Sequence, residues 1–179
     1  MQDEQLPGIR CTQTLLRRLG YLGSPAVRVA TAVIAGASLG SWAAKVFRLE
    51  GRELVLALNE RTYLAVLFPL APRKHFRLQF ARALASALEH LGVPRPIVRA
   101  ECTVIEFQPL TRLRSAQLAD RLDDLEFVCG IELCYHSDLA AVQRNLNELP
   151  HPQRDPCVPA DAVRRLFQGP APSAAQAPH

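Results

Sequence analysis

GSWAAKVFRLEGRELVLALNERTYLAVLF, the stretch from Gly40 to Phe68, decides the fold of this chain. Three apolar runs alternate with the tripeptides Glu50-Gly51-Arg52 and Asn59-Glu60-Arg61. Short runs rich in Val, Leu, Phe and Tyr, separated by Gly or Asn, are typical of consecutive antiparallel strands. We therefore expect a three-stranded meander. Its strands are expected at Ala43–Glu50, Glu53–Leu58 and Thr62–Phe68, the last ended by Pro69 and Pro72.

Helical patterns lie on both sides of this meander. Upstream, Thr12 is the expected N-cap of a short helix that Gly20 ends. Residues 21–41 are compatible with a strand, a helix or a packed loop. Downstream, a strong amphipathic helix is expected, ended by Gly92 and Pro94. Its apolar face consists of Phe76, Phe80, Leu84, Leu88 and Leu91.

The C-terminal half predicts one more strand and three helices. The β-branched run Cys102–Phe107 is expected to be a fourth strand. Ser115 is expected to cap a helix that reaches about Cys134, and Ser137 to cap a helix over 138–146. A last helix is expected over 160–167. Together these elements predict an α+β fold, in which helices pack on an antiparallel sheet of about four strands.

Length and composition indicate the kind of protein. The chain has 179 residues, of which 49% are hydrophobic and 21% charged, and this fits one globular domain. We expect a flexible lead-in at 1–8, a single domain at 9–168 and a disordered tail at 169–179. The five cysteines favour free thiols in a reducing compartment. The longest apolar stretch is about half a membrane span, so we expect a cytoplasmic protein without membrane contact.

Two short motifs contain residue types of catalytic or metal-binding sites. Gly36 to Gly40 matches G-x-S-x-G, which would make Ser38 the nucleophile of a serine hydrolase, an alternative function. We favour a loop of small residues that leads into the meander, and no enzyme. Cys129, Cys134 and His136 are zinc-ligand types, but a structural zinc site needs four ligands, and cysteines five apart lie on different helix faces. We expect no metal and no cofactor.

Basic residues form four groups, and their convergence would support nucleic-acid binding as a second alternative. Arg73 and Lys74 precede a helix N-terminus, whose free N–H groups favour anions. These two residues are therefore the expected contacts for a phosphate or carboxylate. The groups are Arg17-Arg18, Arg73-Lys74-His75 with Arg77, Arg112 with Arg114 and Arg121, and Arg164-Arg165. No nucleic-acid motif accompanies them.

Several fragments occur in a particular order. They are Arg10-Cys11-Thr12 with Leu15-Leu16, Trp42 before the first hairpin strand, Asn59 at a strand end, Arg114-Ser115 before Leu122-Asp123-Asp124-Leu125, and Leu146-Asn147 with Pro150. This order resembles a family of uncharacterised bacterial proteins, a domain of unknown function, over roughly residues 9–168. The chain lacks the glycine that the family has after Arg-Ser, and Asp123 replaces an asparagine. The resemblance implies no activity.

We therefore predict a binding or interaction module, with an unidentified protein as its partner. The family-like residues Arg114, Ser115, Asp123 and Asp124 mark the expected functional face. Arg114 would provide a charge-assisted clamp, and Ser115 a hydroxyl and a helix cap. Trp42 is expected to pack in the core.

Overall fold

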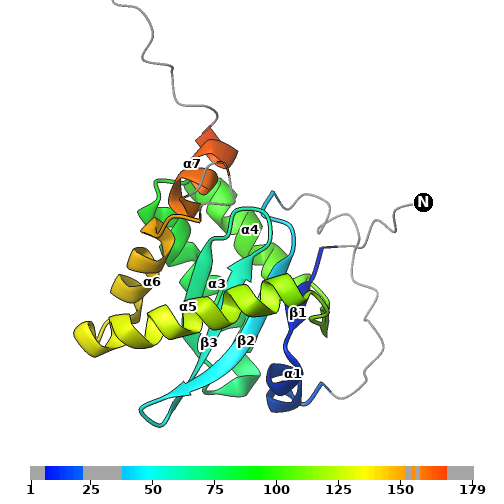
Figure 1. Cartoon of the computed structure of the whole chain (residues 1–179). Helices are drawn as coiled ribbons and strands as arrows, with labels where there is room; N and C mark the ends of the chain where they lie inside the picture. Colours follow the sequence, from blue (N-terminus) through cyan, green and yellow to red (C-terminus); the bar gives the residue numbers. More distant parts are fainter. Residues whose placement is uncertain (1–6, 22–37, 152–154, 156–157, 169–179) are drawn as a thin grey trace, which may run out of the picture.

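The computed structural model describes residues 7–21, 38–151, 155 and 158–168. Within these residues, five strands form one mixed sheet and six α-helices pack around it (Figure 1). The strands are β1 (Ile9–Cys11), β2 (Trp42–Leu49), β3 (Arg52–Asn59), β4 (Ala65–Pro69) and β5 (Leu110–Arg112). The helices are α1 (Gln13–Leu19), α3 (Phe76–His90), α4 (Arg95–Phe107), α5 (Ala116–Tyr135), α6 (Leu139–Glu148) and α7 (Pro159–Gln168), and a short 3-10 helix, η1 (Arg73–His75), precedes α3. The expected α+β class is confirmed.

The meander predicted from the central stretch is confirmed as β2, β3 and β4, which pair antiparallel. Leu49 pairs with Arg52, so the turn between β2 and β3 contains only Glu50 and Gly51. Both turn residues have positive φ angles, 47° and 78°. A two-residue hairpin turn needs such angles to follow the twist of its strands, and glycine adopts them without strain.

The sheet differs from the expectation in strand number and direction. Its order is β4-β3-β2-β1-β5, and β1 runs parallel to both β2 and β5. The expected fourth strand at Cys102–Phe107 is wrong, because these residues form the end of α4. Val98 and Ile105 of this helix lie in a core, and Cys102 packs against it. Val98, Val104 and Ile105 are thus buried on a helix, where tertiary packing overrides local propensity.

Two hydrophobic cores lie on opposite faces of the sheet, because successive strand residues point to opposite sides. In the first core, Val55 and Ala57 of β3 face α3, α4 and α7. In the second core, Leu54, Leu56 and Leu58 face α5 and α6. Figure 1 shows α5 crossing the front of the sheet, with α3 and α4 behind it. The structure is therefore a sheet between two helical layers.

Trp42 lies in the first core, as predicted. The residue is 1% exposed, and its ring meets the ring of Phe80 edge to face, with centroids 5.1 Å apart. Such aromatic pairs stabilise a core beyond the area that they bury.

The helix ends mostly follow the sequence. The hydroxyl of Thr12 accepts a hydrogen bond from the third residue of α1, and Gly20 ends that helix with φ 76°. Ser115 caps α5 in the same way. The prediction that Ser137 caps the next helix is wrong, because Asp138 accepts the free N–H groups at the start of α6. The charged carboxylate of Asp138 is a stronger hydrogen-bond acceptor than the hydroxyl of Ser137.

Some expectations fall on residues that the structure does not describe. These are the undecided segment 22–37, the tail at 169–179 and residues 1–6 of the lead-in. Gly8 is described, and its carbonyl accepts the N–H of Trp42 at 2.9 Å. Among the described helices, none has the length and apolar character needed to cross a membrane.

Candidate functional site

The segment that leads into β2 is held by side chains from elsewhere in the chain. Glu101 of α4 accepts the N–H groups of Ser38 and Leu39 at 2.7 and 3.3 Å, and Arg61 donates to the carbonyl of Ser38 at 2.8 Å. Burial raises the pKa of the Glu101 carboxyl, and these two N–H groups and the charge of Arg61 oppose the rise. This carboxyl fixes the backbone that precedes Trp42.

The hydrolase interpretation of Ser38 requires a strand, a sharp turn and then a helix. The structure instead places Ser38 two residues before Gly40, and the chain continues into strand β2. The backbone on either side of the Ser38 α-carbon is bonded to Glu101 and Arg61. Gly36 and Ala37 of the motif lie outside the described residues. From Ser38 onward the chain leads into a strand, whereas a nucleophile elbow requires a helix there.

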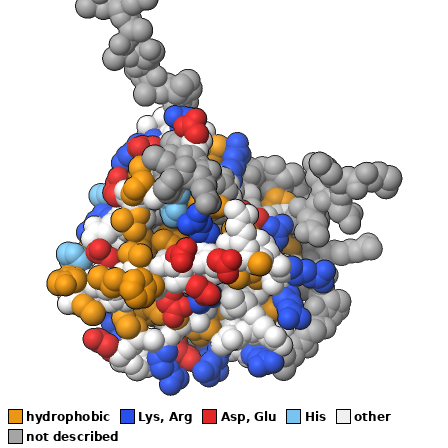
Figure 2. Space-filling model, in the orientation of Figure 1, with side chains coloured by type: hydrophobic (Ala, Val, Ile, Leu, Met, Phe, Trp, Pro, Cys, Tyr) orange, Lys and Arg blue, Asp and Glu red, His pale blue; other side chains and the backbone are white. Residues whose placement is uncertain are grey.

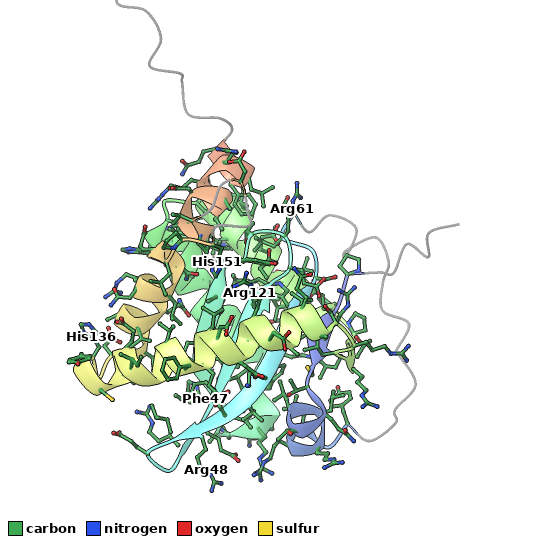
Figure 3. All side chains as sticks on the ribbon, viewed as in Figure 1. Phe47, Arg48, Arg61, Arg121, His136 and His151 are labelled. Carbon is green, nitrogen blue, oxygen red and sulfur yellow. The ribbon has the colours of Figure 1, made fainter. Side chains whose placement is uncertain are left out.

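The cysteine and histidine residues near the end of α5 are separated by burial. Cys129 is fully buried in the second core, while Cys134 is exposed. The prediction that they lie on different helix faces is confirmed. His136 lies 3.8 Å from Glu132, at the end of α5 (Figure 3). Among the residues that the structure describes, no three potential ligands converge on a metal position.

The four residues of the expected functional face lie at the start of α5 and in its first half. Arg114 is exposed, and Ser115 accepts the N–H of Leu118 at 3.3 Å as the helix cap. Asp124 is exposed and lies 3.7 Å from Arg121, one turn away. The structure therefore gives Ser115 a capping role and leaves Arg114 and Asp124 accessible.

Asp123 helps to attach α5 to the sheet. Its carboxylate and that of Glu126 both pair with Lys45 of β2. Burial alone would lower the pKa of Lys45, but the hydrogen bonds and charges of the two carboxylates raise it overall. Lys45 is 14% exposed, whereas Asp123 is 68% exposed. The pair is consequently a contact between two layers of the fold.

Farther along α5, large apolar side chains point to solvent. Phe127 is 71% exposed, Ile131 is 45% exposed and Tyr135 is 80% exposed. They are four residues apart, so they form one stripe on the helix. A Cβ built on Gly130, beside this stripe, would meet no atom within 4 Å. Figure 2 shows hydrophobic side chains gathered over this half of the helix, with acidic side chains beside them.

The expected anion contacts, Arg73 and Lys74, lie in η1. Arg73 is 3.6 Å from the carboxylate of Glu53, which Arg18 and Arg48 also approach, at 3.1 and 3.6 Å. Figure 3 shows Arg48 near the β2–β3 turn, away from α5. One carboxylate thus binds three arginines, which reduces the charge that Arg73 offers to another anion. Lys74 is exposed.

Some arginines of the other basic groups are paired as well. Arg164 pairs with Asp161 at 2.8 Å, Arg165 lies 3.5 Å from Asp155, and Arg121 lies 3.7 Å from Asp124. Neutralised arginines contribute little to binding of a phosphate backbone. The described residues give no support to the nucleic-acid alternative.

The sequence reasoning missed the exposed stripe on α5. Its signal was present, because an amphipathic helix buries Leu118, Leu122 and Leu125 on one face, and Phe127 falls outside that face. Arg95 and Arg99, which line a hollow beside α3, were also missed. Their spacing of four has meaning only on a helix, and no helix was expected at these residues, only a strand at Cys102–Phe107.

The fold and site define a three-layer α+β domain without a recognisable catalytic constellation in its described part. A family model described as "Domain of unknown function (DUF6933)" matches residues 8–162. The chain belongs to that family, which confirms the resemblance drawn from its fragments. No curated protein and no solved structure matches the chain. The family has no assigned activity, so the function must be argued from the surface of the domain.

Proposed function

We propose that this domain is a cytoplasmic interaction module that binds a partner protein through the exposed face of α5. The observation that carries the proposal is the stripe of Phe127, Ile131 and Tyr135, with exposed fractions of 71%, 45% and 80%. Aromatic and aliphatic side chains in a contiguous exposed patch are typical of protein-binding surfaces. The four cysteines that the structure describes are free thiols, which supports a reducing compartment.

Charge defines the kind of partner. Within α5 there are five acidic residues and one basic residue, so the helix has a net charge of −4. The whole chain has a net charge of +4, so the residues outside α5 sum to +8. The acidic residues of α5 are Asp120, Asp123, Asp124, Glu126 and Glu132. With Lys45 of β2, which pairs with Asp123 and Glu126, this face still has a net charge of −3. An amphipathic segment with apolar anchors and lysine or arginine on its flanks complements this face in both respects.

A charge-matched pair of peptides tests this proposal. One synthetic peptide carries leucine at helical spacing with lysine elsewhere, and the other carries glutamate in place of lysine. We expect the lysine peptide to shift the backbone amide NMR resonances of α5, and the glutamate peptide to shift none. Phe127→Gln and Tyr135→Gln should each weaken binding about tenfold, because buried aromatic anchors dominate interface energies.

Control variants separate binding from folding. Leu78→Gln changes an exposed apolar residue, 41% exposed, on α3, and should leave peptide binding unchanged. The three glutamine variants should alter the free energy of unfolding by about 0.5 kcal/mol or less, as exposed substitutions do. Equal binding of both peptides, or resonance shifts away from α5, would contradict the proposal. Sedimentation of a dimer that Phe127→Gln abolishes would identify a second copy as the occupant instead.

A further inference from the structure

A hollow of about 440 Å³ follows the seam between α3 and α4, on the opposite side of the sheet from α5. The two helices are connected by a short turn and pack closely, with the Cys102 thiol donating to the carbonyl of Ala81 at 3.2 Å. Ala81, Ala85 and Val98 line the hollow, together with Cys102. The small side chains of the two alanines leave space along the seam. The hollow has the volume of a small-molecule site.

Three arginines line this hollow. Arg82 comes from α3, and Arg95 and Arg99 come from successive turns of α4. Arg95 and Arg99 are four residues apart, so they project from the same side of the helix. Glu89 is the carboxylate that also lines the hollow. Three guanidinium groups and one carboxylate give the lining a formal charge of +2.

These arginines differ from most others in the described part of the chain. No carboxylate among the described residues lies within ion-pair distance of Arg82, Arg95 or Arg99. By contrast, ion pairs form at Arg10, Arg18, Arg48, Arg73, Arg121, Arg144, Arg164 and Arg165. An unpaired guanidinium beside an apolar hollow retains its donors and its charge for an external anion.

We propose that this hollow binds a phosphate monoester that carries a small apolar group. A monoester has a charge close to −2 at neutral pH, which matches the +2 of the lining. The guanidinium fork matches the geometry of phosphate oxygens. The alanine and valine side chains would contact the apolar group. This site is independent of the proposed partner face on α5.

Calorimetric titration with phenyl phosphate tests the site, with inorganic phosphate, benzoate and phenol as comparison ligands. We expect phenyl phosphate to bind most tightly, inorganic phosphate and benzoate to bind more weakly, and phenol to show no binding. The affinity should increase between pH 5 and pH 7.5, because the second phosphate proton dissociates with a pKa of about 6.

Four variants locate the binding. Arg82→Gln and Arg99→Gln should each weaken phenyl phosphate binding about tenfold, through loss of a charge-assisted hydrogen bond. Glu89→Gln should strengthen it, because a like charge leaves the lining. Arg112→Gln is the matched control, because Arg112 is exposed on β5 and has no ion pair with a described residue, and it should leave the affinity unchanged.

Thermal melting of each variant shows whether the fold is retained, and the gain expected for Glu89→Gln tests the site without loss of an arginine. The proposal is overturned if phenyl phosphate shows no saturable binding, or if benzoate binds as tightly. It is also overturned if Arg112→Gln weakens binding as much as Arg82→Gln, since that result would show general attraction to a basic protein.

Discussion

Glu101 is a buried carboxylate whose neighbours oppose one another. It is 5% exposed, and burial favours its neutral form, while the N–H groups of Ser38 and Leu39 favour the charged form. The net effect is a raised pKa, so the folded state holds the proton more tightly than the unfolded chain. Below the pKa of the unfolded chain, about 4.3, this proton makes its full contribution to stability. The contribution is lost as the pH rises through the raised pKa of Glu101 in the folded state.

We therefore predict a pH-dependent effect of Glu101→Gln. The glutamine does not titrate, so only the parent loses stability as the pH rises above about 4.3. The variant should be less stable than the parent at acidic pH, and the difference should shrink toward neutral pH. Urea unfolding across a pH series measures it, with Glu106→Gln on the exposed side of α4 as the control. A constant difference at every pH would contradict the assignment of the raised pKa to Glu101.

At this scale, the sequence shows which residues are unusual but not which atoms they contact. Asn59 was expected to end a strand, and its side-chain oxygen does accept the N–H groups of Arg61 and Thr62 in the following turn. Its amide nitrogen also donates to the carbonyls of Leu39 and Ser41. The first set of contacts is local and follows from turn chemistry. The hydrogen bonds of the amide nitrogen join residues about twenty positions apart in the sequence, so they depend on the register of the sheet.

Among the elements, α6 completes the open edge of the sheet. β4 is an edge strand, and an unpaired edge is a template for aggregation. Asn147 accepts the N–H of Ala65 at 2.7 Å and donates to its carbonyl at 2.8 Å. One turn earlier, Gln143 accepts the N–H of Leu67 at 2.8 Å. Two buried amides on one helix thus replace the hydrogen bonds of a neighbouring strand.

Replacing one of these amides should expose the edge. Asn147→Leu keeps a similar volume but leaves both polar groups of Ala65 without their partner. We expect a loss of about 2–4 kcal/mol in the free energy of unfolding, one penalty for each buried polar group, and increased light scattering on heating. Asn145→Leu is the control, because Asn145 lies on the exposed side of the same helix and bonds to Glu132. Equal losses in the two variants would contradict the edge-capping role.

Elements with a clear periodicity or cap signal could be predicted from the sequence, and the shortest strands could not. The meander and α3 each carry a pattern of many residues, so their periodicity was sufficient. β1 and β5 contain three residues each, too few to show an alternating pattern. They form strands because neighbouring strands supply their hydrogen bonds. The expected strand at Cys102–Phe107 failed for the opposite reason, since a helix face was read as a β-branched run.

At the scale of the whole molecule, both ends of the described chain contribute to one core. Ile9 of β1 and Val163 of α7 are fully buried in the first core, together with Trp42. β1 lies between β2 and β5, and it hydrogen-bonds to both. The sheet therefore depends on contacts between residues far apart in the sequence, and we expect the described domain to unfold as one cooperative unit.

Adjacent residues of β1 provide the test of this cooperativity. Ile9→Ala removes a fully buried side chain and should lower the free energy of unfolding by about 2–4 kcal/mol. Arg10→Ala, at the next position, removes a partly exposed ion pair with Glu60 and should cost about 1 kcal/mol or less. In urea, the near-ultraviolet circular dichroism of Trp42 and the far-ultraviolet signal should change together in both variants. Separate transitions in Ile9→Ala would show that β1 and the first core unfold independently of the remaining sheet. A cost for Arg10→Ala equal to that of Ile9→Ala would show that the strand is held by its surface charge rather than by its burial.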